Sequence, residues 1–282
     1  MISIVSPFYN EKDIILNAVK LMVYNLTSDF KKWELILVDD GSNDGSLEEL
    51  LNSEIIRNNN IRIITCPYNQ GRGRALKNGI DSAVGEIIVT TEIDCSWGDH
   101  IAKELVEKIY KDNLDVAIAS PHLPGGKLLN VPLQRIFLTR LGNYLINLFF
   151  ISGITMNTGM TRAYRKEVIQ PLICYEDGKD FHLEVLLKLN ILGFRMGEIP
   201  AILEWKDHKL SKNFSKKGKK SSTKIFNTIF THLKFLATAK PRKNFANLAI
   251  VSTFIGTFFF GWAIKNFIVT LPSLFLAILS LQ

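Results

Sequence analysis

The chain has 282 residues, of which 47% are hydrophobic and 22% charged, and its net charge is +7. This length allows one large domain or two small ones. Its three cysteines lie far apart without the spacing of a metal site, so we expect a reducing compartment and no disulfide framework. The first residues read as a strand and lack the basic region and apolar core of a signal peptide, so no secretory leader is expected.

Strand and helix signals alternate along the first 120 residues. Helical patterns cover residues 12–26, 46–56, 72–84 and 99–111. Short apolar runs around them predict strands, namely ISIVS, WELILVDD, IRIIT, EIIVTTEID and DVAIAS. These runs are too continuous for half-exposed strands. The alternation therefore predicts an α/β fold with a mostly parallel central sheet that is covered by helices on both faces.

Polar motifs follow four of these strands. They are PFYNE, DDGSNDGS, CPYNQGRGRA and EID, in chain order. Each motif alone is consistent with a simple turn or a helix cap. Because ligands of open α/β sheets bind at the carboxyl ends of the strands, the four motifs together predict one ligand-binding rim.

The fourth strand ends in two carboxylates, Glu92 and Asp94. Residues i and i+2 of a strand point to the same face, so we expect both carboxylates to project together from the strand end. Such a pair suits Mg²⁺ or Mn²⁺ carrying a diphosphate, since hard cations prefer carboxylate and phosphate oxygens. Taken alone, the pair is equally consistent with two solvated acids in a turn, and the neighbouring motifs favour the metal site.

The second part of the chain begins near Pro121. We expect an amphipathic helix over residues 131–150, a helix over Asp180–Asn190 and a strand at FRMGEIPAILEW. The segment from Lys206 to Lys243 then carries a charge of +11, which leaves −4 for the rest of the chain. Its apolar stripe over residues 223–239 suits a helix on a membrane interface or, equally, a helix packed on the N-terminal body.

Two uncharged stretches, residues 244–264 and 266–282, end the chain. About 20 apolar residues are needed for a membrane-spanning helix, so the first stretch is long enough and the second, with Pro272, is marginal. We expect two membrane spans paired as a hairpin and joined at Lys265. The adjacent basic segment then favours lipid headgroups over nucleic acid and puts the N-terminal body on the cytoplasmic side.

PFYNE, LILVDDGSNDGS and NQGRGRALKNGIDSAVGEIIV, in this order, resemble the family two inverting glycosyltransferases. Within that family they are similar to the polyprenyl-phosphate group exemplified by dolichyl-phosphate mannose synthase. The resemblance runs from Met1 to about Lys240. It implies a GT-A fold and a GDP- or UDP-sugar donor. The domains are then expected to be a catalytic domain over 1–210, a basic juxtamembrane segment over 211–243 and a membrane hairpin over 244–282.

The resemblance also implies roles for residues of the strand-end motifs. Glu92 and Asp94 take the place of the metal-binding D-x-D, with Glu at the first position in place of Asp. Asp94 is the expected direct ligand, whereas Glu92 binds directly, through water or from a shifted position. The implied donor-binding residues are Pro7, Tyr9, Asn10, Glu11, Asp39, Asp40, Gly71, Arg72 and Gly73.

An acceptor half is implied by SPHLPGGKLLNVPLQRIFLTRLGN and by the start of the lysine-rich segment. Some family members have an Arg where this chain has Pro121, so one phosphate contact is absent or supplied elsewhere. Lys206 stands at a position where the family has Arg. The implied acceptor and phosphate contacts are Arg135, Thr139, Ser211 and Lys212, and the implied catalytic residues are Asp94, Arg135 and Lys206.

These assignments predict sugar transfer from a nucleotide-sugar to a polyprenyl phosphate by a multi-pass membrane protein whose catalytic domain is cytoplasmic. A second hypothesis is transfer to a sugar hydroxyl of a lipid-linked glycan, with Asp177 or Asp180 as the base. A third is a catalytically weak, nucleotide-sugar-binding membrane subunit. The membrane helices are a possible site of homo-oligomerisation.

Overall fold

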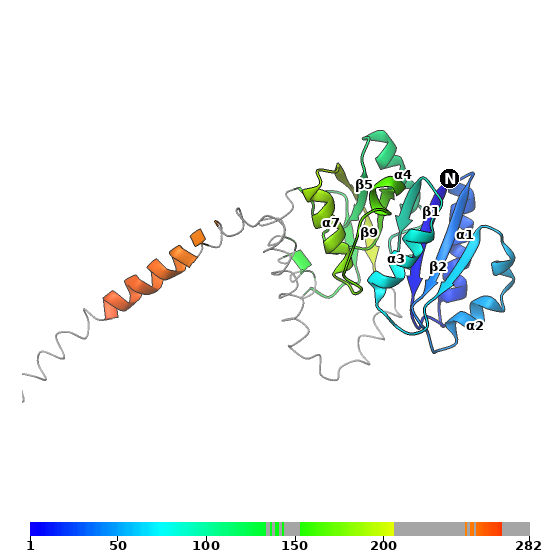
Figure 1. Cartoon of the computed structure of the whole chain (residues 1–282), viewed down its shortest axis with the longest axis horizontal. Coiled ribbons are helices and arrows are strands. Elements are labelled where there is room, and N and C mark those ends of the chain that lie inside the picture. Colours follow the sequence, from blue (N-terminus) through cyan, green and yellow to red (C-terminus); the bar gives the residue numbers. More distant parts are fainter. Residues whose placement is uncertain are drawn as a thin grey trace, which may run out of the picture. The chain divides into compact units, whose positions relative to one another are not determined.

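This computed structural model describes residues 1–133, 136, 139–140, 143, 153–205, 246, 249–250 and 252–266. The chain divides into two compact units, Met1–Thr231 and His232–Gln282. The first unit contains a central sheet with helices on both faces (Figure 1). The predicted domain boundaries at residues 210 and 243 remain predictions.

The central sheet has seven strands in the order β3-β2-β1-β4-β7-β5-β8. β7 is antiparallel to both of its neighbours, and the other pairs are parallel. The sheet is therefore mostly parallel, as predicted. Its strands are β1 (Ile2–Phe8), β2 (Trp33–Asp39), β3 (Ile61–Thr65), β4 (Ile87–Thr90), β5 (Val116–Ser120), β7 (Arg162–Arg165) and β8 (Met196–Pro200).

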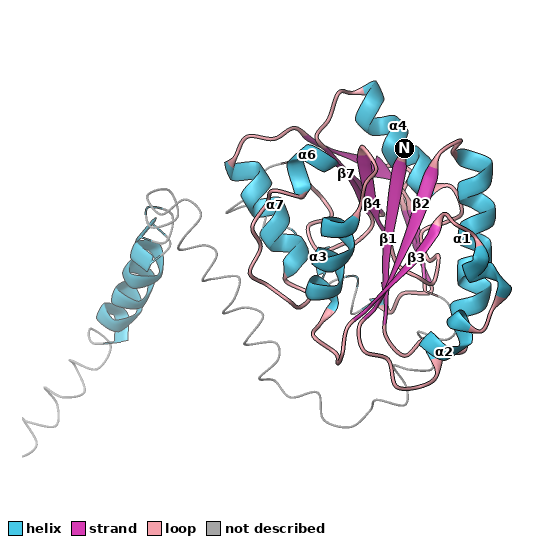
Figure 2. Cartoon of the chain, turned by 45° about the vertical axis from the view of Figure 1, so that its right-hand side comes forward, coloured by secondary structure: helices cyan, strands magenta, loops and turns pink. Residues whose placement is uncertain are grey.

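Helices cover both faces of the sheet, with α3 and α7 on one face and α1 and α4 on the other (Figure 2). Every residue of β1, β2, β4 and β5 is buried, which explains their continuous apolar sequences. The helical elements are α1 (Ile15–Asp29), α2 (Ser46–Leu51), the 3₁₀ helix η1 (Glu54–Arg57), α3 (Arg72–Ser82), α4 (Ile101–Lys111), α6 (Lys166–Ile169) and α7 (Phe181–Ile191).

Two expectations about the strands are wrong in detail. β4 ends at Thr90, so Glu92 and Asp94 lie in a turn and not on a strand. The predicted strand FRMGEIPAILEW is two strands, because the chain leaves the central sheet after β8 and pairs as β9 (Ile202–Glu204) with β6 (Lys127–Leu129). The short strand β7 was not predicted at all.

Most of the predicted helix 131–150 lies outside the described residues.

The C-terminal unit contains a helical stretch over residues 252–266, all of them exposed. Among the helices of the described residues, none has both the length and the apolar character that a membrane span requires. The first predicted span is described only in part. The second predicted span, apart from its first residue Asn266, lies outside the described residues, as does the basic segment 206–243.

A buried carboxylate, Glu34 on β2, ties three segments together at the opposite end of the sheet from the polar motifs. It accepts hydrogen bonds from the Ser3 hydroxyl, the Val84 backbone N–H at 2.8 Å and Arg62 Nη2 at 2.7 Å. Burial acts to raise the pKa of Glu34, but these hydrogen bonds and the Arg62 charge outweigh burial and lower it. A lowered carboxyl pKa stabilises the fold above the unfolded-state pKa of about 4.3, and this contribution disappears as the pH falls through the folded-state value.

We therefore expect Glu34→Gln to lower the free energy of unfolding by about 1–3 kcal/mol at neutral pH, since buried donors lose a charged acceptor. The difference from the wild type should be complete above about pH 4.3 and shrink at lower pH. This difference in the free energy of unfolding is measured by urea denaturation, followed by circular dichroism, at pH values above and below about 4.3. Glu54→Gln, at an exposed ion pair with Arg57, is the control and should have almost no effect. A pH-independent difference for Glu34→Gln would contradict the linkage.

Candidate active site

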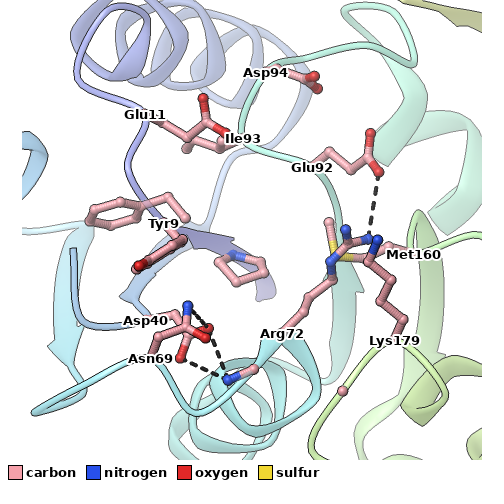
Figure 3. A pocket seen from close by; sticks show the side chains of 14 residues that line it. Tyr9, Glu11, Asp40, Asn69, Arg72, Glu92, Ile93, Asp94, Met160 and Lys179 are labelled. Atoms are coloured by element: carbon pink, nitrogen blue, oxygen red, sulfur yellow. Dashed lines mark hydrogen bonds and ion pairs between the residues drawn. The ribbon is translucent and has the colours of Figure 1, made fainter. Parts of the chain in front are cut away.

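A cavity of about 490 Å³ lies at the carboxyl ends of β1 to β4 (Figure 3). Each of the four predicted strand-end motifs contributes to its wall, and so do Met160, which shortly precedes β7, and the loop before α7. The side chains and backbone that line it belong to Pro7, Phe8, Tyr9, Glu11, Asp40, Asn69, Gly71, Arg72, Glu92, Ile93, Asp94, Met160, Gly178 and Lys179.

The cavity has two chemically different ends. Tyr9, Asp40 and Asn69 lie at one end, and Glu92 and Asp94 lie at the other (Figure 3). Tyr9 is 41% exposed, so its ring is available to a flat ligand. A ligand with an aromatic group at one end and a cation-binding anion at the other matches this distribution.

Asp40 fixes the loop that leads into α3. Its carboxylate accepts hydrogen bonds from the backbone N–H groups of Gln70 at 2.8 Å and Gly71 at 3.1 Å, and from Asn69 Nδ2 at 3.1 Å. Burial raises the pKa of Asp40 above its ordinary value, and these backbone hydrogen bonds oppose that effect. Asp40 therefore holds the cavity wall in shape and also forms part of its surface.

Asn10 and Asp39, which the resemblance assigns to donor binding, do not line the cavity. Asp39 Oδ1 accepts a hydrogen bond from the Ser42 N–H at 2.9 Å. The backbone N–H of Asn10 donates to Ser42 Oγ at 3.0 Å, and Asn10 Oδ1 accepts from the Asn43 N–H at 2.9 Å. The Asn10 bonds fix the loops after β1 and β2 to each other, and the Asp39 bond fixes the loop after β2, so both residues support the site without lining it.

Gly71 and Gly73 allow a loop to pack against the first turn of α3. A Cβ atom on Gly71, whose φ is +103°, would lie 2.5 Å from the Asp177 carbonyl oxygen. A Cβ atom on Gly73 would lie 2.7 Å from the Glu176 carbonyl oxygen. Only residues without a side chain permit this approach. Gly71 lines the cavity, whereas Gly73, another predicted donor residue, does not.

Glu92 and Asp94 are joined through one buried serine. The Ser96 N–H donates to Asp94 Oδ1 at 3.1 Å, and the Ser96 hydroxyl donates to Glu92 Oε2 at 2.8 Å. Ser96 is 2% exposed, and its carbonyl oxygen accepts from the Glu204 N–H of β9 at 2.9 Å. The two carboxylates are thus held on one side of the cavity by a turn, and not by strand alternation as the sequence suggested.

This pair of carboxylates fits a divalent cation that is shared with a diphosphate. Among the residues that the structure describes, no group of three or more His, Cys, Asp or Glu side chains could enclose a metal ion. Mg²⁺ usually keeps several waters and binds through one or two carboxylates and substrate phosphates, so two carboxylates at an open cavity suffice. Arg72 Nη1 lies 3.9 Å from Glu92 Oε1, which adds a cation beside the pair.

Of the remaining predicted residues, the structure describes Thr139. Thr139 is helical and half-buried and is not part of the wall. Arg135, Lys206, Ser211 and Lys212 lie outside the described residues. Sequence reasoning in turn missed Ser96, Asn69 and Lys179. Asn69 and Lys179 meet the other wall residues only through the fold, because Asp40 and Arg72 are distant from them in the sequence or lie on another element. Ser96 is close in sequence to Glu92 and Asp94, and its position next to the acidic pair was the available signal.

The family model described as "Glycosyl transferase family 2" matches residues 3–173. The chain is 28% identical over 210 residues to glycosyltransferase AglD of Haloferax volcanii, covering 72% of this chain and 33% of that protein. It is 26% identical over 207 residues to undecaprenyl-phosphate 4-deoxy-4-formamido-L-arabinose transferase of Salmonella choleraesuis. This match covers 71% of this chain and 58% of that protein. The chain thus spans between a third and three fifths of the length of these curated relatives.

Solved structures share the fold at low sequence identity. Glucosyl-3-phosphoglycerate synthase of Mycobacterium tuberculosis, solved with Mn²⁺, UDP and glucosyl-3-phosphoglycerate, superposes with a TM-score of 0.56 at 16% identity, covering 76% of this chain and 75% of that one. S. aureus TarS 1–349, solved with UDP, superposes with a TM-score of 0.53 at 16% identity, and the match covers 75% of this chain and 62% of that one. Since the family model matches more than half of the chain, the protein belongs to glycosyl transferase family 2 and has a GT-A-like α/β fold.

Proposed function

We propose that this protein is an inverting glycosyltransferase that transfers a sugar from a GDP- or UDP-sugar to a polyprenyl phosphate at the cytoplasmic face of a membrane. The proposal depends mainly on one observation, the carboxylate pair of Glu92 and Asp94 at one end of a cavity formed by four strand ends. Further support comes from the relative whose name specifies an undecaprenyl-phosphate sugar transferase, and from fold neighbours solved with UDP and Mn²⁺.

In this proposal Tyr9, Asp40 and Asn69 bind the nucleoside part of the donor, and Glu92 and Asp94 hold Mg²⁺ or Mn²⁺ on the diphosphate. The cation would stabilise the negative charge that develops on the leaving diphosphate. An acceptor phosphate oxygen attacks the anomeric carbon as the bond to the diphosphate breaks. This oxygen is already anionic at neutral pH, so the protein has to orient the acceptor and needs no general base.

Acceptor binding is proposed for Arg135, Thr139, Lys206, Ser211 and Lys212, on the resemblance alone. The membrane hairpin over 244–282 and the basic segment over 211–243 are proposed to keep the catalytic domain, residues 1–210, at the lipid surface. The charge of +11 between Lys206 and Lys243 supports contact with anionic headgroups.

Transfer to a sugar hydroxyl, the second hypothesis, requires a carboxylate base. Asp177 is a poor candidate because its carboxylate forms ion pairs with Lys77 Nζ at 2.8 Å and Arg74 Nε at 3.2 Å. The hydrogen bond from Lys77, supported by both positive charges, lowers the pKa of Asp177. Asp180 is the N-cap residue of α7, and neither residue lines the cavity. These contacts favour an acceptor that brings its own anionic oxygen.

The decisive test supplies membranes containing the full chain with labelled GDP- and UDP-sugars and a polyprenyl phosphate. We expect a glycolipid that mild acid cleaves, which is the behaviour of a sugar linked through phosphate. Transfer only to a lipid-linked glycan would favour the second hypothesis over this one. Nucleotide binding without turnover of any donor would instead point to a nucleotide-sugar-binding subunit.

Asp94→Ala should reduce metal-dependent transfer by at least about 100-fold, because it removes a charged ligand of the proposed cation. Glu92→Asp should retain or raise activity, since it restores the residue that the family carries at this position. Initial rates over a Mn²⁺ titration measure both effects. Asp99→Ala, which changes an exposed aspartate near the same turn, is the matched control. Full activity of Asp94→Ala would refute the metal assignment.

Ser96→Ala should weaken Mn²⁺ binding about 10-fold or more, because residues that orient metal ligands contribute this much to affinity. Ser96→Thr, which keeps the hydroxyl, should restore it. Electron paramagnetic resonance of free Mn²⁺ in the presence of the full chain and a nucleoside diphosphate reads out binding without turnover. Ser53→Ala serves as the control, because the Ser53 hydroxyl bonds the Leu50 carbonyl and Ser53 does not line the cavity. An unchanged Mn²⁺ affinity in Ser96→Ala would show that Ser96 does not orient the carboxylates.

A further inference from the structure

Lys179 lies in the wall of the cavity although it belongs to the loop before α7. Its side chain and that of Arg72 converge on the same part of the cavity, next to Glu92 (Figure 3). Of the wall residues that the structure describes, these two are the cationic ones. The metal end of the cavity therefore has a carboxylate side and a cationic side.

The backbone that carries Lys179 is fixed on α3. The Arg74 N–H donates to the Asp177 carbonyl oxygen at 3.1 Å, and the Asp177 carboxylate binds Arg74 and Lys77. The close approach of this backbone to Gly71 and Gly73 leaves no space for a shift toward the helix. Lys179 follows Asp177 by two residues, so the position of its backbone is set by these interactions.

A second set of hydrogen bonds fixes the same loop on α7. The backbone N–H groups of Tyr175 and Glu176 donate to the carboxylate of Glu184, at 2.9 Å and 2.8 Å. Glu184 is fully buried and is also paired with Lys188 Nζ at 2.6 Å. With attachments to both helices, the loop presents Lys179 from a defined point beside Arg72, which is what a binding residue requires.

Two cationic side chains in one part of a cavity provide several donors for charge-assisted hydrogen bonds to an anion. Glu92 offsets the charge of Arg72 only partly, because their closest atoms are 3.9 Å apart and both side chains are partly exposed. Once Glu92 holds a cation, its charge is no longer available to Arg72. The planar arginine fork and the lysine ammonium then suit the several oxygens of a phosphate group.

We infer that Lys179, together with Arg72, binds a phosphate group of the reaction at the metal end of the cavity, next to Glu92. This inference rests on the proposed function, and it adds a residue that neither the motifs nor the resemblance assigns. The phosphate belongs either to the nucleotide-sugar or to the lipid acceptor, and the two sources are separable by experiment.

The test uses the full chain in detergent micelles and the variant Lys179→Gln. If the phosphate is that of the donor, the Kd of the nucleoside diphosphate with Mn²⁺, measured by titration calorimetry, should rise about 10-fold or more, and the Kd of the free nucleoside should stay unchanged. If the phosphate is that of the acceptor, the diphosphate Kd stays unchanged and the KM for polyprenyl phosphate rises by a similar factor. Lys179→Arg should retain most of the affinity in either case.

Two further variants separate binding from fold effects. Lys111→Gln, at an exposed lysine on α4, is the matched control for the loss of one charge. Asp177→Asn should weaken phosphate binding less than Lys179→Gln, because it loosens the loop without removing the ammonium group. The double variant should bind no more weakly than Lys179→Gln alone, since both changes act through one side chain.

An unchanged diphosphate Kd together with an unchanged acceptor KM in Lys179→Gln would overturn the inference, even if the enzyme transfers sugar as proposed. Conversely, a raised diphosphate Kd would sustain it even if the acceptor proved not to be a polyprenyl phosphate. The affinity for Mn²⁺ alone should be the same in Lys179→Gln and in the wild type. A loss of Mn²⁺ affinity would show that the variant disturbs the carboxylate pair and would contradict a direct phosphate contact.

Discussion

The parallel pairing of β1 with β2 and β4 is the constraint on which the site depends. β1 and β2 are in register up to Phe8 and Asp39, and β2 and β3 up to Asp39 and Thr65. The pairing continues one residue further, where the Asp40 N–H donates to the Phe8 carbonyl at 3.0 Å. Three loops therefore leave the sheet at one level, and their polar residues meet without any of them being close in the sequence.

β4 differs because its pairing with β1 stops at Val5 and Thr90. The residues after Thr90 leave the sheet earlier than those after β1 and β2, and they turn toward β9, where Ser96 is bonded to Glu204. The carboxylate pair is consequently positioned by hydrogen bonds of a turn. The geometry of the pair depends on Ser96 and on β9 of the two-stranded sheet, and not on the alternation of side chains along β4.

The sequence was sufficient to predict what depends on local patterns. Continuous apolar runs predicted β1 to β5, and the motifs after them predicted most of the cavity wall. β7 was not predicted, because its four residues, RAYR, show no strand pattern and a fully buried arginine such as Arg162 is not expected in a strand from sequence alone. The guanidinium of Arg162 donates to the carbonyl oxygens of His182 and Asn157, and only tertiary structure provides such partners for a buried charge. The placement of Lys179 beside Arg72 likewise depends on interactions between segments that are far apart in the sequence.

The glycines at the start of α3 have an evolutionary consequence. Glycine weakens a helix by about 1 kcal/mol relative to alanine, so Gly73 is locally unfavourable. The backbone of the Glu176–Asp177 loop occupies the space that a side chain at position 71 or 73 would need. Any larger residue at either position would require the loop, and with it Lys179, to move. The segments NQGRG and YEDGK are therefore expected to vary jointly among relatives that keep this contact, although they are distant in the sequence.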